Sequence, residues 1–210
     1  MKNLVVLLVL VVSTNAVLAE DPVFFADPNL KAAVEGELGI PNPTPSDMLG
    51  LTYLDARQRG IVDLIGLKHA TNLTFLDLHN NQISNLSELS EMTMLTTLLL
   101  HRNQISNLSP LANLTNLTTI TLQHNQITDT SPLLDLTGLK SLSLEFNQID
   151  NLSGLSEMSI LTTLPLHRNQ ISDLSSLANL TNLTSITLQH NQITDTSPLL
   201  DLTGLKSLSL

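Results

Sequence analysis

The chain has 210 residues, of which 48 are leucine, while cysteine and tryptophan are absent and aromatic residues make up 2%. Without cysteine the chain cannot form disulfides, a thiolate nucleophile or a cysteine zinc site. The formal charge is -10 at pH 7, and an acidic chain with so few aromatic residues lacks the basic grooves and stacking platforms that nucleic-acid binding requires.

Residues 1–19 have the layout of a cleavable secretory signal peptide. Met1 and Lys2 form a short positive segment, and residues 4–12 are an unbroken apolar run. Such a run rises only about 14 Å as a helix, which is too short to cross a hydrocarbon core of about 30 Å. We therefore predict cleavage after Ala19 and export of the chain, either secreted or to the cell surface, with no membrane span left after cleavage.

Residues 20–50 are predicted to form a small helical N-terminal cap. Asp27 suits the N-cap of a helix, and Gly39 suits its end. Ser46 and Asp47 are expected to cap a second, short helical turn. An apolar stripe at helical spacing would cover the first repeat: Leu30, Val34 and Leu38.

Residues 51–210 fall into lines of equal length that read LxxLxLxxNxIxxLxxLxxLxx. Seven full repeats begin at Leu51, and a partial eighth begins at Leu205. The chain stops at Leu210, where a leucine-rich face would lie uncapped, so we expect the sequence to be incomplete.

Each line combines two kinds of local structure. The LxLxx segment alternates apolar and polar residues, which indicates a half-buried strand. The rest of the line is too short for a full α-helix, and Pro110, Pro132 and Pro198 favour short 3-10 turns there. One repeat cannot bury its own flanks, so the repeats should stack into an α/β solenoid with a parallel sheet on the concave face and 3-10 turns on the convex face.

Two polar positions recur along the predicted solenoid. We expect one asparagine per repeat to be buried and to bond backbone groups, which makes it structural: Asn81, Asn103, Asn125, Asn147, Asn169 and Asn191. A second position is always Asp or Asn, and we expect it to cap the return turn rather than bind calcium: Asp63, Asn85, Asn107, Asp129, Asn151, Asp173 and Asp195.

A longer period indicates duplication of a three-repeat cassette. Residues 95–144 and 161–210 align without gaps and differ at four positions. One difference places Pro165 in the middle of a strand where the sister cassette has Leu99. Proline has no N–H for the sheet, so we predict a weak point between the fifth and seventh repeats.

The repeated lines resemble the leucine-rich repeat family over residues 51–210. The phrase LSPLANLTNLT (108–118) is similar to the bacterial internalin-type subclass. Residues 27–74 are similar to that subclass's helical cap and degenerate first repeat, in which Arg59 and Gly60 replace Asn-Gln. The resemblance implies an extracellular recognition protein whose concave sheet binds protein, or less often glycan, partners. The immunoglobulin-like region and wall anchor of internalins are not in this sequence, so the resemblance does not extend to surface attachment or host-cell invasion.

The outward strand positions are predicted to form columns of neighbouring side chains about 4.8 Å apart. Aromatic, arginine and histidine side chains on an open face are typical interface anchors. The candidate ligand-binding residues are Tyr53, Phe75, Asp77, Leu99, His101, Arg102, His124, Glu145, Phe146, His167, Arg168 and His190. A variable solvated face without contacts is the alternative interpretation.

The sequence offers no candidate for catalysis, metal binding or a cofactor. His79, His101 and His124 are neighbours in the predicted columns, but zinc needs three or four ligands converging at about 2.0–2.3 Å, and strand side chains splay apart. A pH response is a better expectation for these histidines. G-x-S-x-G, H-E-x-x-H and phosphate-binding glycine loops are absent from the sequence. Two hypotheses remain: a non-catalytic exported binding module, or the recognition or spacer arm of a longer surface protein or enzyme.

Overall fold

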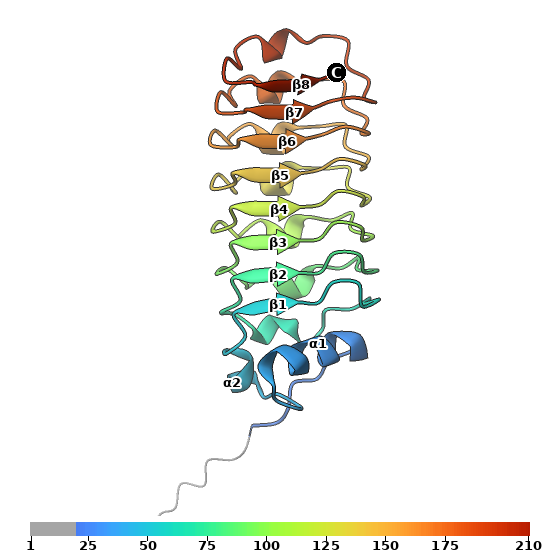
Figure 1. The fold of residues 1–210 in the computed structure, drawn as a ribbon, viewed down its shortest axis with the longest axis vertical. Coiled ribbons are helices and arrows are strands. Elements are labelled where there is room, and N and C mark those ends of the chain that lie inside the picture. The colour runs from blue at the N-terminus through green and yellow to red at the C-terminus, as the bar shows by residue number, and fades with distance from the viewer. Residues whose placement is uncertain (1–19) are drawn as a thin grey trace, which may run out of the picture.

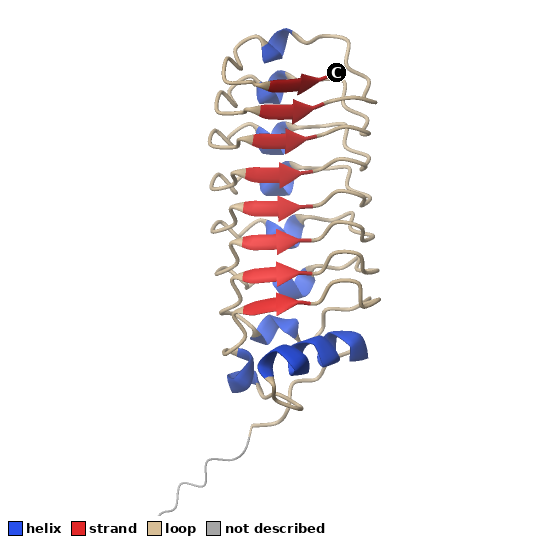
Figure 2. Cartoon of the chain, in the orientation of Figure 1, coloured by secondary structure: helices blue, strands red, loops and turns tan. Residues whose placement is uncertain are grey.

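The computed structural model describes residues 20–210, so the predicted signal peptide lies outside the described residues. Within that range, eight parallel strands form one sheet in strict chain order, and a 3-10 turn lies behind each of the first seven strands (Figures 1 and 2). Two helices cover the N-terminal end of this stack. The predicted solenoid with its helical cap is therefore confirmed.

Each element is short and recurs once in every repeat. The strands are β1 Tyr53–Asp55, β2 Phe75–Asp77, β3 Thr97–Leu99, β4 Thr119–Thr121, β5 Ser141–Ser143, β6 Thr163–Pro165, β7 Ser185–Thr187 and β8 Ser207–Ser209. The 3-10 turns are η1 Leu67–His69, η2 Ser87–Leu89, η3 Ser109–Leu111, η4 Ser131–Leu133, η5 Ser153–Leu155, η6 Ser175–Leu177 and η7 Ser197–Leu199.

Helix α1 (Pro28–Leu38) begins and ends as predicted. The Asp27 carboxylate accepts hydrogen bonds from the N–H groups of Asn29 (2.8 Å) and Leu30 (3.3 Å), and Gly39 ends the helix at φ 67°. The second oxygen of Asp27 accepts the Val62 N–H at 2.7 Å. Because these bonds favour the ionised form more than burial opposes it, they lower the pKa of Asp27. One carboxylate thus caps the helix and ties it to the first repeat.

Helix α2 (Pro45–Met48) is capped differently from the prediction. Its N-cap is Thr44, whose hydroxyl accepts the Asp47 N–H, while Asp47 accepts the Thr44 N–H at 2.8 Å. Ser46 therefore lies inside the helix, and Asp47 closes a capping box from its third position. No helix among residues 20–210 combines the length and apolar character needed to cross a membrane.

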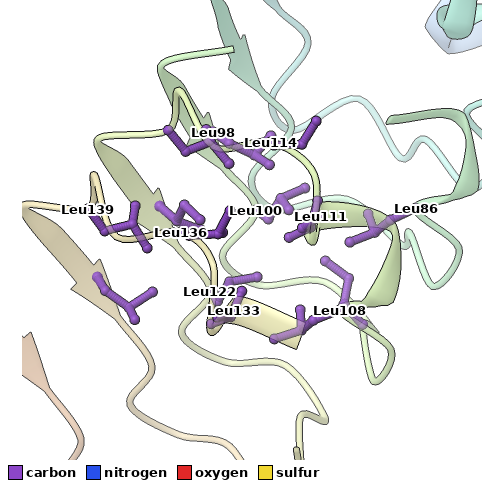
Figure 3. Close-up of a cluster of buried hydrophobic side chains, with 14 of the residues drawn as sticks. Leu86, Leu98, Leu100, Leu108, Leu111, Leu114, Leu122, Leu133, Leu136 and Leu139 are labelled. Carbon is purple, nitrogen blue, oxygen red and sulfur yellow. The ribbon is translucent and has the colours of Figure 1, made fainter. Parts of the chain in front are cut away.

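The core is one continuous column of leucine and isoleucine side chains between the sheet and the turns. Leu98 and Leu100 extend inward from the β3 segment and meet Leu111 and Leu114 from the η3 segment (Figure 3). All four side chains are fully buried. The same arrangement recurs in neighbouring repeats, so each repeat covers the flank of the next.

The predicted asparagine ladder is present. Asn125 Oδ1 accepts the Ile105 N–H of the preceding repeat at 2.9 Å, and its Nδ2 donates to the Leu100 and Leu122 carbonyls at 3.1 and 2.9 Å. The other five members repeat this pattern. The ladder therefore satisfies buried backbone groups in two repeats at once.

The Asp/Asn column also has its predicted role. Asn107 Oδ1 accepts the Ser109 N–H at 2.9 Å, and Asp173 Oδ1 accepts the Ser175 N–H at 2.8 Å. The Ser175 hydroxyl also donates to the second carboxylate oxygen of Asp173. These two hydrogen bonds lower the pKa of the Asp173 carboxyl. These side chains start the 3-10 turns.

The sheet is interrupted at Pro165. Strands β5 and β6 pair only at Ser141 and Thr163, whereas every other pair of neighbouring strands is in register over three residues. The β6–β7 pairing is complete. The pairing gap is therefore on the β5 side of the proline alone, where the Pro165 carbonyl still accepts the Leu144 N–H at 3.1 Å, and the weak point stays a prediction.

We predict that Asn125→Ala lowers the free energy of unfolding by about 1–3 kcal/mol, because it leaves buried backbone groups of two repeats without partners. Ser143→Ala is the control, since this outward side chain should contribute less than about 0.5 kcal/mol. Urea denaturation measures both variants. Equal losses would mean that the ladder does not stabilise the stack.

We predict that Pro165→Leu raises the free energy of unfolding by about 1 kcal/mol, because it restores a sheet N–H opposite β5. Hydrogen exchange should slow for residues 139–146 and stay unchanged for residues 183–190. Unchanged or faster exchange at 139–146 would contradict the proposed gap in the ladder.

Candidate binding face

The open side of the sheet, here called the strand face, consists of four columns of outward side chains. In-register pairing of the strands builds the first two columns, as predicted. The first column is Tyr53, Phe75, Thr97, Thr119, Ser141, Thr163 and Ser185, and the second is Asp55, Asp77, Leu99, Thr121, Ser143, Pro165 and Thr187. The third is Arg57, His79, His101, Gln123, Glu145, His167 and Gln189, and the fourth is Gln58, Asn80, Arg102, His124, Phe146, Arg168 and His190.

The fourth column has a backbone conformation that the sequence pattern did not predict. Its seven residues have φ between 55° and 59°. This left-handed region is uncommon for bulky side chains such as Phe146. Backbone bonds to the next repeat hold the conformation, as where Arg102 N–H donates to the Gln123 carbonyl at 2.9 Å. Each ladder asparagine follows one of these residues directly.

Tyr53 and Phe75 stack at the N-terminal end of the strand face. Their ring centroids are 4.6 Å apart, and the ring planes are nearly parallel. Tyr53 is exposed and Phe75 is half-buried, so the pair leaves a flat aromatic surface accessible. This arrangement suits the predicted role of both residues.

Asp77 does not have the exposed position that was expected of a ligand-binding residue. Its side chain is buried, and Oδ1 lies 2.8 Å from His79 Nδ1 and accepts the His79 N–H at 3.0 Å. Asp77 therefore orients His79, which sequence reasoning had omitted from the candidate residues although it occupies the same column as His101.

His79 and His101 form a second stacked pair, with centroids 4.3 Å apart. His101 Nδ1 also lies 3.1 Å from Thr121 Oγ1. Burial, followed by the neighbouring charge of His79, lowers the pKa of His101. Arg102, next to it in the fourth column, is exposed.

Phe146 is the centre of the largest cluster. His124 stacks on it at 4.0 Å, His167 meets its ring edge-on at 5.1 Å, and the Arg168 guanidinium lies 5.1 Å from its centroid. Burial against this ring and the positive charge of Arg102 lower the pKa of His124. Five of the predicted residues, including Glu145 beside Phe146, thus come together from three adjacent repeats.

Glu145 and Gln123 hold acceptor atoms without partners. Glu145 Oε2 and Gln123 Oε1 are buried and accept no hydrogen bond from residues 20–210. Burial raises the pKa of the Glu145 carboxyl. Sequence reasoning did not single out Gln123, because nothing in its position distinguishes it from the other polar residues of its column.

The remaining candidates are Leu99 and His190. Leu99 is half-buried between Asp77 and Thr121 in the second column. His190 is exposed in the last full repeat. Among residues 20–210, no group of three or more His, Asp or Glu side chains is arranged to hold a metal ion.

Comparison with known proteins places these features in a family. A model described as leucine-rich repeats in two copies matches residues 93–133, 115–157 and 161–200, and a single leucine-rich repeat model matches residues 72–92. No curated protein sequence matches the chain significantly.

Solved structures include several similar solenoids. Internalin C2 of Listeria monocytogenes is 36% identical, with a TM-score of 0.72, and the match covers 91% of this chain and 100% of that one. Another Listeria internalin, internalin F, is 27% identical, with a TM-score of 0.67, over 92% of this chain and 72% of that one. A leucine-rich repeat protein of Leptospira interrogans is 28% identical, with a TM-score of 0.73, over 78% and 44%. The chain therefore belongs to the leucine-rich repeat family, in its bacterial internalin-type branch.

Proposed function

We propose that the chain is an exported, non-catalytic binding module that recognises a protein partner on its strand face, the concave side expected of such solenoids. Membership of the internalin-type branch supports a protein-interaction role. The Phe146 cluster is the main observation that supports the strand face as the binding surface. It presents an aromatic ring, a guanidinium and two imidazoles on a sheet that no other described element covers.

The chemistry of the cluster favours association over turnover. Aromatic and arginine side chains in a partly desolvated centre carry most of the binding energy in protein interfaces. Among residues 20–210, histidine, serine and acidic groups do not form the buried, hydrogen-bonded triad that nucleophilic catalysis needs. The rigid sheet also fixes the ring positions before binding, which reduces the entropic cost of association.

Glu145 and Gln123 offer a second, polar reason for this face. Buried acceptors without donors destabilise the free protein, and a donor supplied by a partner would remove that penalty once the side chains rotate toward it. Unpaired groups at the centre of the strand face are therefore consistent with a site that is completed on binding.

The location of the interface can be tested with a photo-crosslinking residue. Benzoylphenylalanine at Ser143, on β5, should form adducts with extracellular proteins, and the same residue at Glu157, behind η5, should not. Phe146→Ser should abolish the Ser143 adducts while leaving the melting temperature within a few degrees. Equal adducts from both positions, or adducts only from Glu157, would contradict binding at the strand face.

We predict that Glu145→Gln stabilises the free protein at pH 8 and has no effect at pH 4. The raised pKa means that ionisation of Glu145 costs more in the folded state than in the unfolded state, so the penalty develops as the pH rises from the unfolded-state pKa and is complete above the folded-state pKa. The gain should be below about 1 kcal/mol, because the Glu145 side chain as a whole is only partly buried and water screens its charge. Urea denaturation at the two pH values measures it, and an equal effect at both would contradict the assignment.

A further inference from the structure

Charge is distributed unevenly between the strand face and the rest of the molecule. Residues 20–210 contain eight Lys and Arg against nineteen Asp and Glu, a formal charge of -11. The strand face carries three arginines and three acidic residues, so its own formal charge is zero. It also holds five of the six histidines. The excess negative charge therefore lies entirely outside the strand face.

Two of the three arginines on this face have no acidic partner. Arg57 pairs with Asp55, with Nε 3.2 Å from Oδ2. Arg102 and Arg168 are exposed and form no ion pair with any residue in the range 20–210. An exposed guanidinium presents a planar set of N–H donors that matches a carboxylate.

Histidines flank each unpaired arginine in the same way. His101 and His124 lie beside Arg102, and the duplication of the cassette places His167 and His190 beside Arg168. The geometry repeats as well, since His101 Nδ1–Thr121 Oγ1 and His167 Nδ1–Thr187 Oγ1 are both 3.1 Å. None of the four sequence differences between the cassettes falls on these residues.

The second unit also borders a hollow. A depression of about 280 Å³ is lined by His167, Arg168, Thr187, Gln189 and His190. Arg168 is held over the Phe146 ring, so the edge of its guanidinium remains available for in-plane hydrogen bonds. A carboxylate-sized group fits this setting.

We propose that the strand face binds an acidic, extended peptide segment through two carboxylate-recognition units with the same residue order, His101–Arg102–His124 and His167–Arg168–His190. The proposal rests on the proposed function and specifies the chemistry of the partner. The two units are three strands apart, which corresponds to about 14 Å at the usual strand spacing. An extended peptide advances about 3.3 Å per residue, so two acidic side chains four residues apart span the same distance when the peptide crosses the strands.

Binding of such a peptide strengthens as the pH falls. The groups that face His101 are His79, Asp77, Arg102 and His124, and those that face His124 are Arg102 and His167. Most of these neighbours are positively charged and disfavour the protonated form of both imidazoles. A bound carboxylate opposes this effect, so it favours protonation of both rings. Glu145 also loses its charge more readily than an ordinary glutamate, and an acidic peptide remains largely ionised at pH 5.5.

Fluorescence anisotropy with two labelled peptides tests the proposal. Both contain two glutamates in a Ser/Gly background, four residues apart in one and adjacent in the other. The purified chain should bind the spaced peptide about 10-fold more tightly, because only that peptide engages both units. Affinity for it should be higher at pH 5.5 than at pH 8.0.

Arginine variants supply the matched controls. Arg102→Gln and Arg168→Gln should each reduce the affinity for the spaced peptide about 10-fold, to the level of the adjacent peptide. Arg57→Gln, which removes a paired arginine from the same face, should leave it unchanged. Melting curves check that the variants fold, and the comparison of the two peptides on the unmodified chain does not depend on them.

Several results would overturn the proposal. They are equal affinity for the two peptides, no measurable binding of either, or an effect of Arg57→Gln as large as that of Arg102→Gln. Binding of oligogalacturonate but not of the spaced peptide would assign the units to an acidic glycan instead. If the peptides fail while the Ser143 crosslinks persist, the strand face still binds a partner and only its acidic character is wrong. If both fail, the proposed function fails as well.

Discussion

The side-chain amide of one asparagine per repeat is the interaction on which the rest of the fold depends. Asn103 accepts the Ile83 N–H of the preceding repeat and donates to the Leu78 and Leu100 carbonyls. These groups lie where the backbone turns away from the sheet and cannot bond to another strand. The ladder therefore allows every repeat to turn at the same point, which keeps the outward residues in columns.

The periodicity of the sequence predicted the fold well because register in this solenoid follows from repeat length. A constant repeat length places Phe75 beside Thr97 and Thr97 beside Thr119. The cap of α2 was predicted correctly for Asp47 and wrongly for Ser46, because Thr44, Ser46 and Asp47 are all good capping residues and only the path of the preceding loop selects Thr44 as the N-cap.

The sequence predicts which column each residue of the strand face belongs to, but it predicts less well how the side chains in these columns contact one another. Asp77 was expected to be exposed, but its side chain is buried and its carboxylate lies 2.8 Å from the His79 ring. The stacking of His124 on Phe146 depends on the left-handed backbone at both residues, and neither is glycine, which would have indicated such a conformation. Rotamers and neighbour contacts of this kind do not follow from spacing alone.

Duplication of a cassette has different consequences for the fold and for the face. In a solenoid each repeat contacts only its neighbours, so a copied cassette keeps its own geometry wherever it is inserted. The copy therefore reproduced the flanking histidines of Arg102 at Arg168, including the His–Thr contact of the same length, although only Arg168 lies over a phenylalanine ring. The difference at Pro165 interrupts pairing with β5 but leaves the β6–β7 register and the residues around Arg168 in place. A change that weakens the stack at one junction can thus leave the spacing of the two arginine units, and with it the geometry of recognition, intact.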